Sequence, residues 1–325
     1  MGHVRKFMKR HFRHFNARET LMAAEAYDSH IKAGGKMLIT LAGGMSTGEL
    51  GVSLARMIRE DKVHAISCTG ANLEEDVFNL LAHDEYEVIP EWRALGAEDE
   101  EALCQRGMNR VTDTCIPEGV MRNVEEKLTE KWKLACESEE QKFPSEFLFD
   151  ILRCGSLEKH YQIDPEESWV LAAIEMEIPV YVPGWEDSTT GNFFTANVMN
   201  GILPHHNCVK SGTEQFQHLM EWYLNNNGTC EGLPSVGFFQ IGGGISGDFA
   251  ICAVPCIIQD LNLDTPLWGY FAQISDALTS YGGYSGAPPN EKITWTKLAV
   301  ETPRFHIQSD ASIVAPLIFS HVLGD

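Results

Sequence analysis

Short apolar runs alternate with amphipathic stretches along most of the chain. Glycine or small polar residues bound each apolar run, which is typical of strands buried in a parallel sheet. The runs predict strands at residues 36–42, 63–68, 178–183, 236–241, 267–275 and 304–308. The stretches between them predict helices at residues 17–33, 118–136 and 167–177, after Ser46 and Asn72, and at the C-terminus. We therefore expect an α/β fold, with a mostly parallel sheet and helices on both faces.

Two of the helix starts depend on capping-box patterns. Ser46-x-x-Glu49 follows the turn Gly43-Gly44, and Asn72-x-x-Glu75 follows the second predicted strand. Helix N-termini at the ends of parallel strands present free N–H groups that can bind phosphate. The glycines do not form the GxGxxG fingerprint, so these residues alone leave a dinucleotide site as one option among others.

The chain divides at about residue 30. Residues 1–30 form a basic, aromatic N-terminal arm and helix, which we interpret as a docking segment or a partly ordered tail. Residues 31–325 form a single α/β domain, and the acidic residues from about 84 to 165 form a cap or insertion within it. No apolar run is long enough to cross a bilayer, so we expect no membrane span.

Composition narrows the class of partner and the compartment. Nine cysteines without a CxxC pair predict reduced thiols in a cytoplasmic protein, and the twelve histidines show no ligand spacing, so we expect no metal site. The net charge of -21 repels nucleic acid and attracts cations such as polyamines. Solubility alone explains this charge equally well.

A glycine-rich loop at residues 279–287 leads through Pro288-Pro289 into a run at residues 293–298 that has strand character. Alternating side chains would place Trp295 and Lys297 on the same side. An indole that excludes water from an ammonium lowers its pKa, which makes the amine a usable nucleophile. A surface lysine at a strand end, beside a core tryptophan, explains the same run.

The motif set Ser285-Gly286-Ala287, Pro289, Glu291 and Trp295-x-Lys297 resembles the loop of deoxyhypusine synthases that carries their imine-forming lysine. That family uses NAD to oxidise spermidine and transfers the aminobutyl group through an enzyme-lysine imine to a protein lysine. The resemblance implies a Rossmann-like NAD-binding fold over residues 30–322 and a homotetramer with active sites between subunits. Lys297 would be the nucleophile and Trp295 a wall of the substrate channel.

The turns at the predicted strand ends are similar to the family's NAD-contacting turns. The matching positions are Ser46, Thr47, Thr69, Gly70, Asp187, Gly242, Gly243, Asp310 and Ala311. Glu75 matches a glutamate that faces both nicotinamide and substrate, and the resemblance makes it the candidate proton-transfer group or ammonium anchor. The acidic run Glu74-Glu75-Asp76 is also explained as a first helical turn favoured by the helix macrodipole.

The polyamine side departs from the family pattern. Asp248 stands where the family has a histidine, Cys252 replaces an asparagine, and Asn192, Tyr281 and Tyr284 replace acidic residues. Amides and phenols do not supply the charge that holds an ammonium. These departures fit either loss of activity or a different amine substrate, and the retained Lys297 favours the second. Glu291, Asn192, Asp248, Tyr284 and Ser285 are the expected substrate contacts.

The resemblance leads to a functional hypothesis with two alternatives. The chain would be an NAD-dependent transferase that moves an aminobutyl-type group from a polyamine-like donor, through a lysine imine, to an acceptor amine that could be a protein lysine. One alternative is polyamine biosynthesis of the homospermidine synthase type. The other is an NAD-binding paralogue without catalysis. In each case we expect a homo-oligomer.

Overall fold

The computed structural model describes residues 2–279 and 282–325. Its centre is a six-stranded sheet in which every neighbouring pair is parallel, in the order β6-β2-β1-β7-β8-β9. The strands are β1 (Met37–Leu41), β2 (Ala65–Cys68), β6 (Val180–Tyr181), β7 (Gly237–Ile241), β8 (Tyr270–Ile274) and β9 (Arg304–Ile307). All six predicted strands are therefore present, and the predicted α/β class with a parallel sheet is confirmed.

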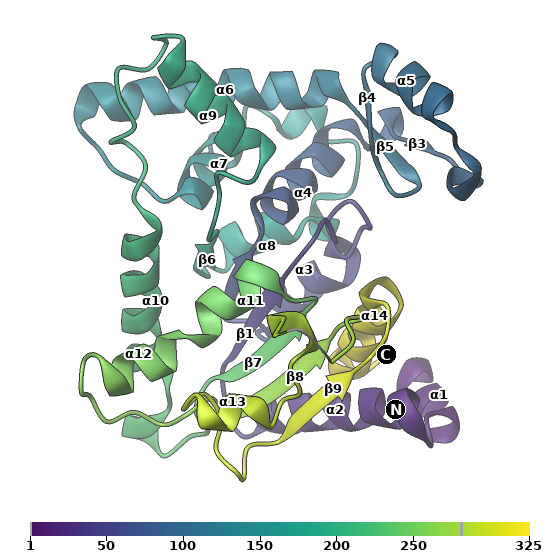
Figure 1. Ribbon diagram of the computed structural model, residues 1–325, viewed down its shortest axis with the longest axis vertical. Coiled ribbons are helices and arrows are strands. Elements are labelled where there is room, and N and C mark those ends of the chain that lie inside the picture. Colours follow the sequence, from purple (N-terminus) through teal and green to yellow (C-terminus); the bar gives the residue numbers. More distant parts are fainter. Residues whose placement is uncertain (1, 280–281) are drawn as a thin grey trace.

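The strand order reverses its direction between β1 and β7. Earlier strands build outward from β1 in one direction and later strands build outward from β7 in the other (Figure 1). In doubly wound sheets the crevice for a ligand opens at this point, outside the carboxyl ends of the strands. The fold therefore designates the loops after β1 and β7 as the first place to look for a site.

Helices cover both faces of the sheet (Figure 1). Residues of β1, β7 and β8 are buried along their full length because side chains on both faces pack against helices. One face carries α2 (Phe15–Lys32), α3 (Gly51–Arg59) and α14 (Ala311–Leu323), and the other carries α10 (Gly212–Asn226), α11 (Gly244–Ile251) and α12 (Ala253–Gln259). Two hydrophobic cores result, one on each side of the sheet.

A helical region extends the first of these cores beyond the end of the sheet (Figure 1). It contains α4 (Gly70–Ala82), α6 (Glu118–Ser138), α7 (Pro144–Arg153), α8 (Trp169–Glu175) and α9 (Thr189–Met199). A small antiparallel sheet, β3-β5-β4, lies beside it with α5 (Ala97–Gln105). Its strands are β3 (Glu87–Val88), β4 (Met108–Val111) and β5 (Thr114–Pro117). Residues 84–165 thus contribute both a small sheet and the long helix that covers α4 and α9.

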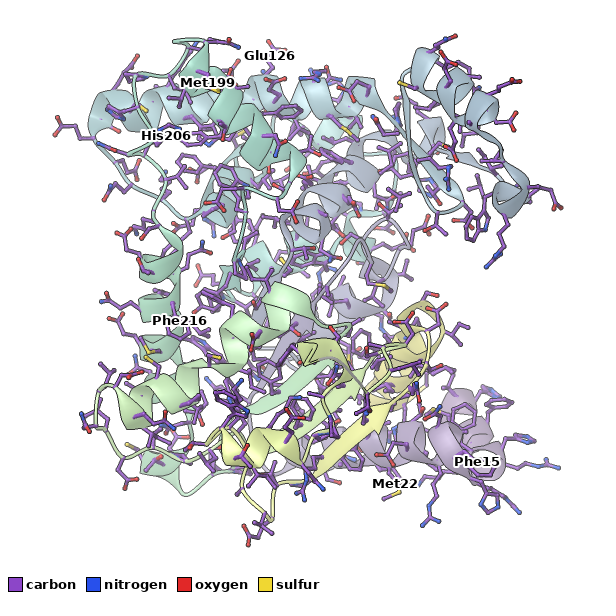
Figure 2. The ribbon with its side chains drawn as sticks, in the orientation of Figure 1. Phe15, Met22, Glu126, Met199, His206 and Phe216 are labelled. Carbon is purple, nitrogen blue, oxygen red and sulfur yellow. The ribbon has the colours of Figure 1, made fainter. Side chains whose placement is uncertain are left out.

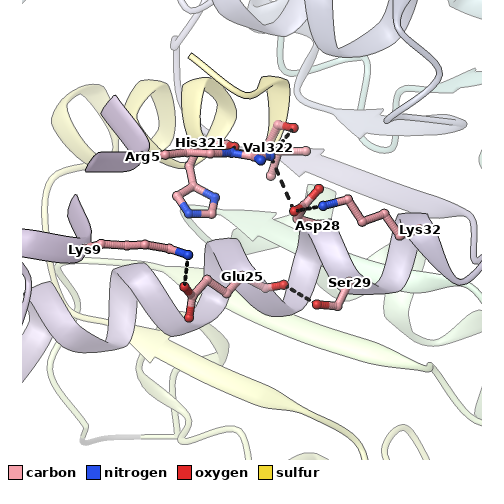
Figure 3. A network of polar contacts seen from close by, with 8 residues as sticks. All are labelled: Arg5, Lys9, Glu25, Asp28, Ser29, Lys32, His321 and Val322. Carbon is pink, nitrogen blue, oxygen red and sulfur yellow. Dashed lines mark hydrogen bonds and ion pairs between the residues drawn. The ribbon is translucent and has the colours of Figure 1, made fainter. Parts of the chain in front are cut away.

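The basic N-terminal arm forms a helix, α1 (His3–His11), that docks on the C-terminal helix α14. Arg5 donates to the carbonyl of His321 and pairs with Asp28 at 3.4 Å, and Lys9 pairs with Glu25 at 3.4 Å (Figure 3). Of the two interpretations of the N-terminal arm, residues 3–11 follow the docking one: they form a helix that packs on another helix of the same chain. Among the described residues, none of the helices is long and apolar enough to span a membrane.

Both capping-box predictions misplaced the helix start. α3 begins at Gly51 because residues 44–50 form turns, and the Ser46 hydroxyl donates to the carbonyl of Asn72 at 2.6 Å instead of capping a helix. α4 begins at Gly70, capped by the Thr69 hydroxyl, which accepts from the Asn72 amide. At Ser46 a contact between the two loops replaces the local pattern, whereas α4 is capped locally, three residues earlier than the sequence predicted.

Candidate active site

The resemblance placed Lys297 at the centre of the site, and Lys297 lies in the wall of a pocket of about 550 Å³. Four other expected substrate or catalytic residues line the same pocket: Asp248, Tyr284, Glu291 and Trp295. Phe216 of α10, labelled in Figure 2, also lines this pocket. Its ring packs edge to face on Phe249, with the two ring centres 5.2 Å apart. This group of predicted residues is therefore assembled by one chain.

The backbone around Lys297 is not the strand that the sequence suggested. Residues 291–294 form one helical turn, α13 (Glu291–Thr294), and Thr296 has a left-handed φ of 57°. The Lys297 amide donates to the Lys292 carbonyl, and the Lys297 carbonyl accepts from the amide of Trp268 in the core. The turn ends there because the chain must rejoin the sheet beside Trp268, so Lys297 projects from a fixed point.

Electrostatic and aromatic neighbours surround the Lys297 ammonium. Its Nζ lies 3.5 Å from Asp248 Oδ1 on α11, 5.6 Å from the Tyr284 ring centre and 5.9 Å from the Trp295 ring centre. The lysine is 7% exposed, whereas Trp295 is 63% exposed. Trp295 and Lys297 thus share one side, as expected, but in the single chain the indole leaves the pocket open to water.

Tyr284 and Ser285 secure the loop more than they offer free polar groups. In the 3-10 helix η6 (Tyr284–Gly286), the Tyr284 hydroxyl donates to Gln240 at 2.7 Å, and burial raises its pKa well above 10. The Ser285 hydroxyl accepts from the Gly244 amide at 3.2 Å. Tyr284 therefore contributes its ring to the pocket, and Ser285 connects the pocket loop to the glycine turn. Tyr281 lies outside the described residues.

The glycine turn after β7 sits at the point where the strand order reverses. A Cβ on Gly243 would lie 1.8 Å from Ser285 Oγ, and Gly242 has a φ of 79°. Only glycine permits both this left-handed turn and the close approach of the loop. The expected cofactor residues Gly242 and Gly243 therefore lie directly beside the loop that leads to Lys297.

The neighbouring turns at this edge are held together by hydrogen bonds. The Thr69 hydroxyl donates to the Gly43 carbonyl at 2.7 Å, and the side-chain amide of Asn72 (Nδ2) donates to the same carbonyl at 2.6 Å. Gly70 packs so closely on Ser188 that a Cβ would lie 2.4 Å from the serine Cβ. Asn72, which the sequence suggested only as a cap, is thus the residue that joins the first two loops.

Two expected cofactor contacts are already engaged within the chain. The Ser46 hydroxyl is buried and accepts from Trp169 Nε1 at 2.9 Å while donating to Asn72. The Thr47 hydroxyl donates to the Glu75 carboxylate at 2.8 Å. Ser46 therefore supports the loop rather than presenting a free hydroxyl, and Thr47 orients Glu75.

Glu74, Glu75 and Asp76 lie beyond the first turn of α4, which carries no acidic residue, so the explanation by the helix macrodipole is wrong. The three residues have three different roles. Glu74 accepts from the amides of Thr189 and Thr190, both at 2.8 Å, and so caps α9. Asp76 accepts from the Ser168 hydroxyl and the Val170 amide, and so caps α8. Within the described residues, Glu75 forms a hydrogen bond only with Thr47, and it lines a second pocket. Glu75 is therefore the carboxylate of this run that remains available for chemistry.

Burial sets the protonation of Glu75. Desolvation raises its pKa to about 7, with a further increase from Glu74, while the hydrogen bond from Thr47 opposes the shift. A carboxyl group with a pKa near neutrality can both donate and accept a proton at working pH. This property fits the role that the resemblance gave to Glu75.

The second pocket has a volume of about 640 Å³ and shares no lining residue with the Lys297 pocket. Glu75, Asp187 and Asn192 line it. Asn192 donates to the carbonyls of Glu186 and Ser188 at 2.9 and 2.6 Å, so its amide nitrogen is committed to the loop. In Figure 1, α4 lies toward the α6 and α9 end and α13 toward the opposite end. One chain therefore separates the expected residues into two groups.

The remaining expected cofactor residues, Asp310 and Ala311, lie after the edge strand β9. Asp310 caps α14 by accepting from the amide and hydroxyl of Ser312, both at 2.8 Å. Among the residues that the structure describes, no cluster of three or more histidine, cysteine, aspartate or glutamate side chains could hold a metal ion. All nine cysteines are free thiols.

Lys292 is among the residues of the Lys297 pocket that the sequence analysis did not identify. Lys292 of α13 is 3% exposed, although a strand beginning at residue 293 would have left it in the preceding loop. Burial lowers its pKa to about 8. In the sequence, the one hint at Lys292 was its position five residues before Lys297. Its burial follows from the helical turn α13, which the sequence analysis did not predict.

Comparisons with known proteins agree with the motifs. The family model for deoxyhypusine synthase matches residues 6–322. "Probable deoxyhypusine synthase 2" of Methanosarcina mazei is 24% identical, over 96% of this chain and 83% of its own length. "Probable deoxyhypusine synthase 1" of Archaeoglobus fulgidus is 24% identical, over 95% of this chain and 90% of its own length. These relatives span the same regions as the motifs.

A cyanobacterial relative and a solved structure extend the comparison. The "Deoxyhypusine synthase-like protein" of Thermosynechococcus vestitus is 25% identical, over 88% of this chain and 69% of its own length. A crystal structure from Entamoeba histolytica, whose name assigns it to the deoxyhypusine synthases, superposes with a TM-score of 0.58. It covers 94% of this chain and 87% of the other at 13% identity, which demonstrates a shared fold.

Proposed function

Since the chain belongs to the deoxyhypusine synthase family, we propose that it transfers an alkylamine group of the aminobutyl type from a polyamine-like donor to an acceptor amine. Lys297 carries the group as an imine, and NAD is the cofactor. The observation that carries this proposal is a lysine only 7% exposed, in the wall of a pocket and beside a carboxylate.

The loops at the carboxyl ends of the strands fit a dinucleotide. The N-termini of α4 and α11 both begin at this edge, and backbone amides at helix N-termini favour phosphate. Gly242 and Gly243 keep side chains away from the turn, and Asp187 and Asp310 are exposed acceptors for hydroxyl groups. When bound, NAD would supply hydride chemistry at an amine-bearing carbon.

The chain's own groups perform the transfer. The Lys297 amine, once deprotonated, attacks the C=N carbon of the oxidised donor, and the nitrogen of that C=N bond leaves with a proton as a free amine. The acceptor amine then attacks the lysine imine, and Lys297 is released as an amine. The group is left on the acceptor as an imine, which the hydride returned by the cofactor would reduce to an amine. Asp248 holds the Lys297 side chain in place between these steps, and Glu75 accepts and returns the proton.

The two groups of site residues support an active site shared between two copies of the chain. The Glu75 pocket and the Lys297 pocket have no residue in common, and Trp295 leaves most of its ring exposed. When a second copy brings its Glu75 pocket opposite Lys297, the indole is covered and water is excluded. This arrangement is the one that the family uses, and it makes a homo-oligomer, in the family a tetramer, part of the proposal.

The departures from the family favour a donor other than spermidine. Asp248 is paired with Lys297, the Asn192 amide is committed to its own loop, and the Tyr284 hydroxyl is committed to Gln240. Each charged hydrogen bond that is lost costs about 1.5–3 kcal/mol. Two such losses weaken spermidine binding roughly a hundredfold or more.

Amine-dependent formation of NADH tests the proposed function. The full chain is mixed with NAD and a panel of diamines and polyamines, and absorbance reports hydride transfer. Because a complete transfer returns the hydride, NADH accumulates only when the acceptor is left out, and we expect at least one amine to form it under that condition. Product analysis with free diamines and with a protein lysine as acceptors then separates homospermidine-type synthesis from protein modification. NAD binding without turnover of any amine would instead identify a non-catalytic paralogue.

A further inference from the structure

Lys292 is a buried ammonium without a partner. It is 3% exposed, and its Nζ has no hydrogen-bond partner within the described part of the chain. The Nζ lies 4.8 Å from the ring centre of Phe271 and 5.0 Å from that of Tyr284. A lysine ammonium has three donors, and aromatic faces satisfy them only in part.

The folded chain retains this charge at a cost. Burial is the main cause that lowers the Lys292 pKa to about 8, and the positive charge of Lys297 adds to it, while Glu291 and Asp248 oppose it. About 90% of the side chain is still protonated at pH 7 with such a pKa. The unpaired ammonium is therefore present under ordinary conditions, and an apolar residue of similar length would avoid the penalty.

The charged neighbours of Lys292 do not provide a hydrogen-bond acceptor for its ammonium. Asp248 on α11 is the carboxylate that pairs with Lys297, and Glu291 on the same turn is exposed and forms no ion pair in the described chain. Burial lowers the pKa of His306 on β9, and the positive charge of Lys292 lowers it further, so His306 adds no negative charge beside Lys292. What is missing around Lys292 is an acceptor with a negative charge.

The Lys292 side chain belongs to the lining of the Lys297 pocket. Three carboxylates also line this pocket, those of Asp248, Asp260 and Glu291. They attract the ammonium of a ligand and repel a multiply charged anion such as phosphate. An aliphatic amine that also carries a single carboxylate complements both sets of charges.

We propose that Lys292 binds the carboxylate of the donor, so that the pocket takes an aliphatic amine bearing a carboxylate rather than a plain polyamine. This inference depends on the proposed function because it assigns a substrate class to the same site. The Lys292 ammonium turns on its flexible four-carbon stem from the two rings toward the pocket, where the ligand supplies the acceptor. A plain polyamine would bring further positive charge beside Lys292 and Lys297.

Calorimetry with a matched pair of ligands tests the assignment. Putrescine and ornithine share a four-carbon diamine, and only ornithine adds a carboxylate. With the full chain and NAD at pH 7, we expect ornithine to bind at least tenfold more tightly than putrescine. Lys292→Met should lose this preference and bind putrescine as well as before or better. Lys133→Met, at an exposed position on α6, is the control and should behave as the native chain.

A second measurement uses the native chain and so does not depend on the folding of a variant. With lysine labelled with carbon-13, NMR follows the titration of Lys292. Saturating ornithine should raise its midpoint from about 8, because a bound carboxylate favours the charged form, and putrescine should not.

The inference is overturned if putrescine binds as tightly as ornithine, if neither binds, or if Lys292→Met keeps the preference. The proposed function fails separately, when no amine yields NADH and none is trapped on Lys297. Trapping of a plain diamine on Lys297 with unaltered turnover in Lys292→Met would refute the carboxylate site and leave the transferase intact.

Discussion

At the scale of single residues, hydrogen-bond partners distinguish carboxylates that are available for chemistry from carboxylates that cap helices. Glu74, Glu75 and Asp76 are consecutive and buried, but of the three only Glu75 accepts no hydrogen bond from a backbone amide in the described part of the chain. The sequence could identify the acidic run and could not divide it, because the capped helices α8 and α9 begin about a hundred residues later. The family resemblance selected the same residue that the hydrogen bonds leave free.

The raised pKa of Glu75 predicts a specific pH dependence of stability. Its folded pKa is about 7 and its ordinary value is 4.5, so between these pH values the folded chain holds a proton that the unfolded chain has lost. Relative to Glu75→Gln, the native chain should lose about 2–3 kcal/mol of unfolding free energy as pH rises from 4.5 to 7. Below pH 4.5 this contribution is fully present.

Urea denaturation of both proteins across pH 4–8 measures this difference. Glu75→Gln keeps the acceptor for Thr47 and removes only the titration, so other groups cancel in the comparison. Parallel stability curves for the two proteins would mean that Glu75 is not desolvated in the folded chain.

At the scale of elements, the apolar runs predicted the positions of the strands well. The capping patterns placed the starts of α3 and α4 at the wrong residues. The strands follow from burial on both faces, which a sequence records directly. The turn around residues 44–50 is instead determined by Asn72, and the turn before Lys297 by its return to Trp268. Such contacts join segments distant in sequence, so local spacing carries no signal for them.

The contact between the glycine turn and the Lys297 loop should be sensitive to one methyl group. In Gly243→Ala the new Cβ would lie 1.8 Å from Ser285 Oγ, so the loop must move. We expect a loss of NAD affinity of at least tenfold, together with a lower melting temperature. Ser285→Gly removes the colliding side chain and should restore part of both properties in the double variant.

Calorimetry with NAD and thermal melts of the three variants check this coupling. Gly212→Ala is a suitable control, because a Cβ there meets no atom within 4 Å at the start of α10. Undiminished NAD binding in Gly243→Ala would show that the turn is not part of the cofactor site.

At the scale of the whole molecule, the two pockets of one chain predict that activity requires two chains. The sequence could indicate this only through the family resemblance, since no residue pattern records which chain completes a site. Mixing inactive Glu75→Gln with inactive Lys297→Ala tests it. Mixed oligomers contain sites with both native halves, so random exchange should restore roughly a quarter of native activity.

Gel filtration of the mixture should show the same oligomer as the native protein. If activity never exceeds the sum of the two separate variants after subunit exchange, each chain holds its own complete site. The exposed Phe15, Met22 and Met199, labelled in Figure 2, are candidates for coverage in that oligomer because large apolar side chains gain by burial.

The central claim is that Lys297 forms an imine with the transferred group. The most direct measurement is reduction with borohydride during turnover with NAD and an active amine, followed by mass spectrometry of the peptides. We predict a stable mass increase on Lys297, absent without NAD and absent in Lys297→Arg, whose guanidinium stays protonated and cannot attack. An adduct on another lysine, or turnover retained by Lys297→Arg with no adduct on the native chain, would contradict the mechanism.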